Sequence, residues 1–187
     1  MAKNIHNCPV CESAQLEPRQ LSDGLDAWAC PSCDGYWVKG TNYFQWLKNH
    51  SDQTVSAEDN GLVHVSEGDS KAGKFCIDCG RYMRRVAVGH GQPFHLDRCT
   101  SCGGFWFDAN EWSALKAVGM HCEAHPVFTD SWQAEVRRQS RQQADQRRLT
   151  DRLGEDGVAQ LESLKRWVAE HPHGSEIMAA ITDPADT

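Results

Sequence analysis

The sequence predicts a small α+β fold in which two β-hairpin modules, each followed by a short helix, stand in tandem before an α-helical arm. Three observations predict it. Eight of the nine cysteines fall into four Cys-x-x-Cys pairs, the spacing of these pairs repeats once along the chain, and the C-terminal third follows a helical pattern. Modules this short with paired cysteines are expected to be held together by bound metal ions.

Composition narrows the class of protein. The chain has 187 residues and a net charge of -7, and no apolar run approaches the length of a transmembrane helix. The N-terminus lacks the apolar segment of a secretory signal, so a cytoplasmic location is expected. Because the cytosol keeps thiols reduced, the cysteines favour metal binding over a disulfide framework.

The cysteine spacing matches a four-thiolate zinc site twice. Eighteen residues separate the first two pairs and 19 separate the last two, which is typical of paired Cys-x-x-Cys zinc sites. A short hairpin carries two sulfurs to each side of the ion, giving a tetrahedron with sulfur about 2.3 Å from zinc. The expected ligand sets are Cys8, Cys11, Cys30 and Cys33 for one Zn²⁺, and Cys76, Cys79, Cys99 and Cys102 for another.

Three alternatives to this assignment stay open from the sequence. A redox-active Cys-x-x-Cys pair is typically a single motif in a βαβ context, whereas this chain has four pairs. Iron also accepts a tetrahedral set of four thiolates. A cross-braced arrangement would join the first pair to the third, although each copy already holds a complete ligand set.

The two copies continue to agree after their second cysteine pair. Cys33-Asp-Gly-Tyr-Trp37 aligns with Cys102-Gly-Gly-Phe-Trp106 at an offset of 69 residues. Two ligand sets with nearly the same spacing and similar following residues indicate an internal duplication.

Each copy resembles the transcription-factor-IIB-type zinc ribbon, a module found in many small bacterial proteins. The second copy carries the family's pattern over residues 99–108, followed by Glu111. It departs from the pattern at Ile77, where proline is usual, and the first copy has Lys39 and Asn42 in place of the Asp and Glu. The resemblance implies structural zinc but no single function, because ribbons serve as nucleic-acid readers, protein docks or structural staples.

The first module is expected over residues 1–50. Asp23-Gly24 indicates the turn between its two strands, and residues 41–48 are expected to form a short helix. A polar, acidic linker is expected over residues 51–73.

The second module is expected over residues 74–120. Asp108 and Glu111 have the spacing of a capping box, so its helix is expected to begin there and to end near Gly119. Each module has about 40 residues, too few for a stable core without metal. Replacing Cys99 by serine is therefore expected to unfold the second module and to leave the first intact.

Residues 121–187 are expected to form a helical arm with a frayed acidic tail. The helical pattern runs over 131–170 and is interrupted by two glycines. Leu161, Leu164 and Val168 make a narrow apolar stripe that needs a partner. The arm is therefore expected to bind another protein or a second copy of this chain.

Basic residues gather in two places that could attract the phosphates of a nucleic acid. They are Arg81, Arg84, Arg85 and Arg98 in the second hairpin, and Arg137, Arg141, Arg148 and Arg152 on one face of the arm. The first hairpin has a net negative charge and is expected to repel phosphate.

The sequence shows no catalytic constellation, and the protein is expected not to be an enzyme. Four cysteines on each zinc leave no coordination position for water. His121, Cys122 and His125 could form a third metal site, which the sequence leaves open. The expected function is a zinc-binding protein-interaction adaptor, and the alternative is a nucleic-acid-binding or transcription-associated protein.

Overall fold

The computed structural model describes residues 7–50 and 72–183, and its elements follow the order expected for two hairpin modules and a helical arm. The predicted linker lies almost wholly outside the described residues. The strands are β1 (Glu17–Ser22), β2 (Leu25–Ala29), β3 (Tyr36–Val38), β4 (Arg84–Gly89), β5 (Gln92–Arg98) and β6 (Phe105–Phe107). The helices are α1 (Gly40–His50), α2 (Glu111–Ala117), α3 (Asp130–Glu170) and α4 (Gly174–Thr182), with the short 3-10 turns η1 (His121–Glu123) and η2 (Pro126–Phe128).

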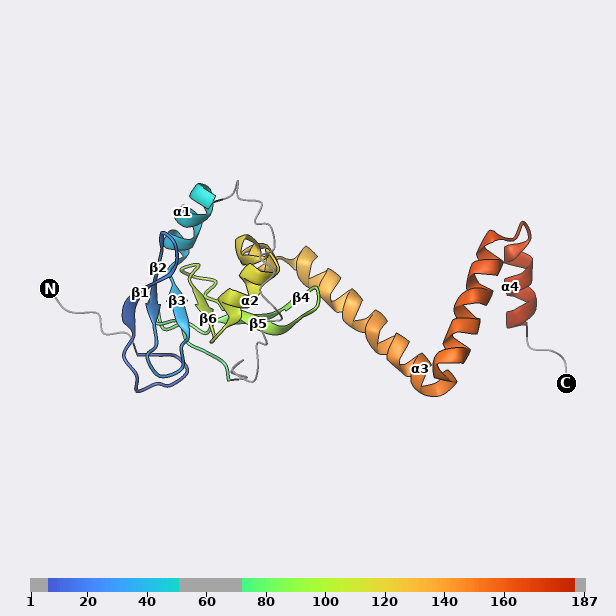
Figure 1. Ribbon diagram of the computed structural model, residues 1–187, viewed down its shortest axis with the longest axis horizontal. Helices are drawn as coiled ribbons and strands as arrows, with labels where there is room; N and C mark the ends of the chain where they lie inside the picture. Colours follow the sequence, from blue (N-terminus) through green and yellow to red (C-terminus); the bar gives the residue numbers. More distant parts are fainter. Residues whose placement is uncertain (1–6, 51–71, 184–187) are drawn as a thin grey trace. The chain divides into compact units, whose positions relative to one another are not determined.

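The six strands belong to one antiparallel sheet with the order β1-β2-β3-β6-β5-β4 (Figure 1). β3 of the first module pairs with β6 of the second, and the register places Trp37 opposite Trp106. The residue before Trp37 is paired with the residue after Trp106, and the residue after Trp37 with the residue before Trp106. An approximate two-fold axis between the two tryptophans therefore relates the modules. The duplicated modules therefore form one continuous sheet.

Gly35 and Gly104 let the two modules approach each other at this axis. A β-carbon on Gly35 would lie 2.3 Å from Cζ2 of Trp106, and one on Gly104 would lie 2.3 Å from Cζ2 of Trp37. Closely packed interiors leave no room for a methyl group at that distance. The glycine and the tryptophan that recur in both copies thus form the contact between the copies.

One face of the sheet packs against both short helices and forms a core shared by the two modules. The rings of Tyr43 in α1 and Phe105 in β6 have centroids 4.9 Å apart, and those of Trp46 in α1 and Trp112 in α2 are 5.5 Å apart. All four side chains are buried. Aromatic residues of both modules therefore make up the same core. The expectation that each module folds by itself stays a prediction.

The start of α3 closes the outer edge of the sheet at β4. Trp132 donates from Nε1 to the carbonyl of Val88 at 2.8 Å, and Gln133 donates from Nε2 to the carbonyl of the preceding strand residue at 2.9 Å. The first compact unit of the chain consequently extends to Val136. The sequence predicts an arm from residue 121, whereas residues 121–136 contribute side chains to the core and edge of the sheet.

The second compact unit, Arg137–Thr187, is made of helices and is described to residue 183. α3 is interrupted at Gly154, whose φ of 69° and ψ of 172° are not helical. α4 forms where the sequence predicts a frayed tail, so that expectation is corrected. Val168 lies against Gly174 at the start of α4 and is the one buried residue among those described in this unit.

No helix among the described residues has both the length and the apolar character needed to cross a bilayer.

Candidate metal centres

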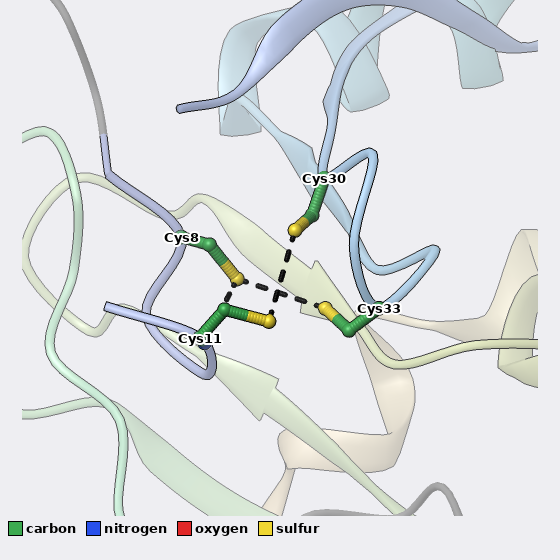
Figure 2. Close-up of side chains that lie close together, drawn as sticks. All are labelled: Cys8, Cys11, Cys30 and Cys33. Atoms are coloured by element: carbon green, nitrogen blue, oxygen red, sulfur yellow. Dashed lines mark hydrogen bonds between the residues drawn. The ribbon is translucent and has the colours of Figure 1, made fainter. Parts of the chain in front are cut away.

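The first candidate metal centre lies between two tight turns of the first module, whose cysteine side chains point toward a common point (Figure 2). The sulfurs of Cys8, Cys11, Cys30 and Cys33 all lie within 4.8 Å of one another. Sγ of Cys8 is 3.7 Å from Sγ of Cys33, and Sγ of Cys11 is 3.9 Å from Sγ of Cys30. Sulfurs at about 2.3 Å from a tetrahedral ion lie about 3.8 Å apart, so these four fit one metal ion.

The second centre repeats this arrangement. The sulfurs of Cys76, Cys79, Cys99 and Cys102 also lie within 4.8 Å of one another. Sγ of Cys76 is 3.5 Å from Sγ of Cys102, and Sγ of Cys79 is 3.5 Å from Sγ of Cys99. Cys79 and Cys102 are exposed, whereas no cysteine of the first centre is. The structure thus brings together each predicted set of four cysteines, which excludes the cross-braced arrangement.

The same tight turn holds each pair of cysteines. The backbone N–H of the residue after the second cysteine donates to the carbonyl of the first cysteine, at 2.8–3.1 Å in the four turns. That residue has a positive φ in each turn, as a glycine in the second module (Gly80 and Gly103) but as Glu12 and Asp34 in the first. Because glycine has no β-carbon it adopts this backbone readily, whereas Glu12 and Asp34 are strained there.

Backbone N–H groups point at the cysteine sulfurs and favour the thiolate that a metal ion requires. The N–H of Cys102 donates to Sγ of Cys99 at 3.5 Å. Burial raises the pKa of Cys99, but hydrogen bonds from the N–H groups of Cys102 and Ser101 and with the thiols of Cys79 and Cys102 together lower the pKa to about 7. Burial raises the pKa of Cys8 to about 11. Four neighbouring sulfurs need a cation between them to be charged together, so the donor set fits a divalent ion that displaces thiol protons.

Both centres stand within segments that match a known family. The sequence model of the TFIIB-type zinc-ribbon family, described as Transcription factor zinc-finger, matches residues 7–49 and 76–118. The chain carries two tandem TFIIB-type zinc ribbons. No curated protein and no solved structure gives a significant match. Ribbon 1 denotes residues 7–50 below, and ribbon 2 denotes residues 72–120.

Ribbon 2 contains a buried network of charged side chains. Nζ of Lys74 donates to Asp97 at 2.6 Å and to Asp108 at 3.0 Å. Asp108 also accepts from Nε1 of Trp106 at 2.6 Å, and its own backbone N–H donates to Glu111 at 2.9 Å. The predicted capping box is therefore confirmed for Glu111, which reaches back, and wrong for Asp108, whose carboxylate binds Lys74 and Trp106.

Ribbon 1 has other residues at the acidic positions of this network. Lys39 stands at the position of the second aspartate and is exposed. Asn42 stands at the position of the glutamate and donates to the backbone carbonyl of Asp26 at 3.3 Å. α1 nevertheless begins at Gly40, where a β-carbon would lie 2.7 Å from the backbone of Gly103 in ribbon 2. Ribbon 1 thus starts its helix by packing on ribbon 2.

The arginines of the second hairpin are largely engaged within the protein. Arg85 lies 3.8 Å from Asp97, and the guanidinium of Arg98 lies over the ring of Phe105 at 5.3 Å. Burial lowers the pKa of Arg98. Arg84 donates to a backbone carbonyl at 3.1 Å. The four predicted arginines of the arm, by contrast, are all exposed: Arg137, Arg141, Arg148 and Arg152.

The structure does not assemble the suggested third metal site. His121 is buried, and its ring contacts the rings of Trp46 and Trp112 at centroid distances of 5.8 and 5.9 Å. Burial lowers the pKa of His121, in keeping with a neutral ring. Within residues 7–50 and 72–183, the groups with metal-ligand geometry are the two cysteine clusters, so His121, Cys122 and His125 belong to the core and its rim.

One surface feature was missed by the sequence reasoning. Phe75 and Tyr82 form an edge-to-face pair with centroids 5.7 Å apart, and their side chains are 61% and 63% exposed. The equivalent bridge in ribbon 1 joins Asn7 and Gln15. Comparing the two copies position by position would have revealed this difference, because the duplication supplies its own reference.

Proposed function

We propose that each four-cysteine centre holds one Zn²⁺ ion with a structural role. The donor set supports zinc, because four thiolates in a tetrahedron form its usual structural site and leave no position for water. Iron binds the same set, so elemental analysis decides between the metals. Protein expressed without added metal is expected to contain two zinc ions per chain. Visible thiolate-to-iron absorption would contradict the proposal.

The function that the molecule supports best is a non-enzymatic, cytoplasmic protein-interaction adaptor whose arm is the association element. The observation that carries this proposal is the near absence of burial in the described part of Arg137–Thr187, where Val168 alone is buried. Leu164 and Trp167 are 44% and 52% exposed. Helices in proteins gain most of their stability by packing an apolar face, and these helices bury little apolar surface, so a partner is expected to stabilise them.

Truncation after Arg138 tests the adaptor role. A cut after Met120, at the domain boundary predicted from sequence, would remove Phe128 and Trp132 from the core, so the later position is needed. The shortened chain is expected to stay folded and to keep both zinc ions. It is expected to lose the proteins that the full chain retains after cross-linking in its native host. An unchanged set of cross-linked proteins would place association on the ribbons and contradict the arm's role.

Nucleic-acid binding is the second candidate function, and the exposed aromatic pair favours it. Aromatic rings beside cationic groups form platforms on which unpaired bases stack, and Arg81 is exposed next to Tyr82. Arg85 already lies beside Asp97 and Arg98 over the ring of Phe105. This counts against nucleic-acid binding, because each phosphate contact needs its own cation. The adaptor role is therefore preferred.

Exchanging the aromatic pair for the residues of ribbon 1 tests this second function. Phe75→Asn combined with Tyr82→Gln installs the side chains that ribbon 1 carries at its equivalent bridge. If the ribbon reads nucleic acid, affinity for single-stranded DNA or RNA at low salt is expected to fall at least about tenfold. Absence of binding by the wild-type chain at low salt would reject nucleic-acid binding.

A further inference from the structure

The first half of the arm is an exposed helix. Every residue from Ser140 to Arg148 is exposed. A helix in a protein gains most of its stability by packing one face against another surface. This segment is accordingly the part of the described chain most in need of a partner.

The two halves of the arm carry opposite charge. The basic half, residues 137–153, has six arginines and two aspartates and a net charge of +4. The acidic half, residues 154–183, has six acidic residues against one lysine and one arginine and a net charge of -4. Arg148 pairs with Asp145 at 3.2 Å, and Lys165 pairs with Glu162 at 2.9 Å. Each of these ion pairs joins residues of the same half, so neither neutralises the charge of one half with that of the other.

Each half also places several of its charges together on one side of α3. At 3.6 residues per turn, the arginines at 137, 141, 148 and 152 fall within about 60° of one another. The glutamates at 155, 162 and 170 fall within about 80°, and Arg166 lies within the same arc. All seven side chains are exposed. The arm therefore presents a stripe of four arginines in its basic half and, in its acidic half, a stripe of three glutamates with Arg166 among them.

We propose that two copies of the chain associate through their arms in antiparallel orientation, with the basic half of each copy against the acidic half of the other. This inference rests on the proposed role of the arm and names its partner as a second copy. A parallel pairing would place +4 against +4 and -4 against -4, and like charges across an interface repel. The antiparallel pairing places opposite charges together twice.

Residue spacing supports this pairing. Arg141 and Glu170 lie equally far along the chain from the middle of the Gly154–Gly157 segment, and Arg148 and Glu162 do so within one residue. A two-fold axis at that segment sets each of these arginines level with a glutamate of the second copy. Such an interface is isologous, so it closes as a dimer and does not extend into a filament.

Apolar burial adds to the charge pairing. Trp167 stands three residues before Glu170 on the same helix and is 52% exposed in the single chain. Side chains three apart lie side by side on a helix, so a partner helix against Glu170 also covers part of the indole ring. Closure of the acidic half onto the basic half of the same chain would cover Ser140–Arg148, which the structure shows exposed.

Charge exchange in the full-length, zinc-loaded protein tests the proposal. Sedimentation equilibrium is expected to give twice the 20.9 kDa mass of one chain. Arg141→Glu with Arg148→Glu and, separately, Glu162→Lys with Glu170→Lys are each expected to weaken the dimer at least about tenfold. An equimolar mixture of the two variants is expected to restore it, because each variant then meets its complement.

A matched control separates position from net charge. Arg138→Glu with Arg147→Glu changes the net charge by the same amount on the same helix, but outside the basic stripe. This control is expected to keep the dimer within about threefold of wild type. Circular dichroism and two bound zinc ions per chain verify that every variant is folded.

Three results would overturn the proposal: a wild-type chain that stays monomeric, a dimer that both charge variants leave intact, or a mixture of the variants that does not recover the dimer. A monomeric wild-type chain whose cross-linked partners still disappear on truncation after Arg138 would overturn the second copy as partner while the adaptor role stands. A monomeric chain with unchanged partners would overturn both.

Discussion

At the scale of single residues, Lys74 neutralises two buried carboxylates at once. Its side chain is 1% exposed, and Asp97 and Asp108, which accept its hydrogen bonds, are nearly as buried. Burial lowers the pKa of Lys74, but Asp97 and Asp108 outweigh burial and hold the pKa above its usual value. Removing the lysine takes away the cation that both buried carboxylates share, while Arg85 stays 3.8 Å from Asp97. Loss of a partner from buried charges is far costlier than removing an exposed ion pair.

Lys74→Met is therefore expected to lower the free energy of unfolding by about 3–5 kcal/mol, because Asp97 and Asp108 lose their cation. Urea unfolding of the zinc-loaded protein measures the change. Lys39→Met is the control, since Lys39 is exposed in ribbon 1, and its effect is expected to stay within about 0.5 kcal/mol. Equal effects of the two substitutions would show that the network adds nothing to stability.

Replacing either of two strained residues in ribbon 1 is expected to stabilise the protein. Glu12 and Asp34 adopt φ values of 59° and 55°, while ribbon 2 has glycine at both equivalent positions. Glu12→Gly is expected to stabilise the protein by about 1 kcal/mol, and Asp34→Gly by somewhat less, because Asp tolerates this backbone better than Glu. Ser32→Gly, at an exposed position without positive φ, is expected to give no gain. Thermal unfolding with zinc bound compares the three variants.

At the scale of elements, β3 and β6 join the ribbons although each strand has only three residues. Such short strands form few ladder hydrogen bonds, so side-chain packing across the axis contributes much of the contact. Each indole ring is anchored by its N–H: Trp37 donates to Asp78 at 3.3 Å and Trp106 donates to Asp108 at 2.6 Å. The anchored rings then cover the glycines of the opposite ribbon.

Gly35→Ala is expected to destabilise the protein by about 2–3 kcal/mol, because its β-carbon meets the ring of Trp106. The backbone of Gly35 has no positive φ, so the loss is steric. Adding Trp106→Phe makes room for the methyl group. In a double-mutant cycle by urea unfolding, the combined loss is expected to be smaller than the sum of the single losses. Strict additivity would place the strain somewhere other than this contact.

At the scale of the whole molecule, the two metal centres share one buried cluster. Cysteines of both centres pack with Trp37 and Trp106 between the ribbons, and the aromatic core on the other face also draws on both ribbons. A bound structural zinc can supply roughly 10–16 kcal/mol to a small domain. Metal bound at either centre therefore stabilises a fold that the other centre needs.

Cys99→Ser is expected to weaken zinc binding at both centres, contrary to the independent folding that the sequence alone suggests. Removing one of four thiolates from ribbon 2 loosens the shared core on which ribbon 1 packs. Competition with a chelator, read out as zinc per chain by native mass spectrometry, measures the effect. Retention of one zinc ion with wild-type affinity would show that the ribbons fold separately.

The local features of this protein were determined by the sequence. The two ligand sets follow from cysteine spacings of a few residues, the duplication follows from matching spacings, and the helical pattern of the arm follows from periodicity. The sequence also showed that Gly35 and Gly104 are equivalent, but it did not show that each packs against the tryptophan of the other ribbon. These features are readable because a knuckle turn or a helix depends on neighbours within a few positions.

Only the tertiary structure decided how the pieces combine. The pairing of β3 with β6, the burial of Lys74 and the stacking of Arg98 on Phe105 join residues that no local period connects. The boundary of the arm at Val136 was likewise not predictable from local sequence. It depends on Trp132 and Gln133, which bind the edge of a strand more than 40 positions earlier. From sequence alone, a charged residue near a hairpin is expected to be exposed. Only the packed structure shows whether it is buried and paired with an opposite charge.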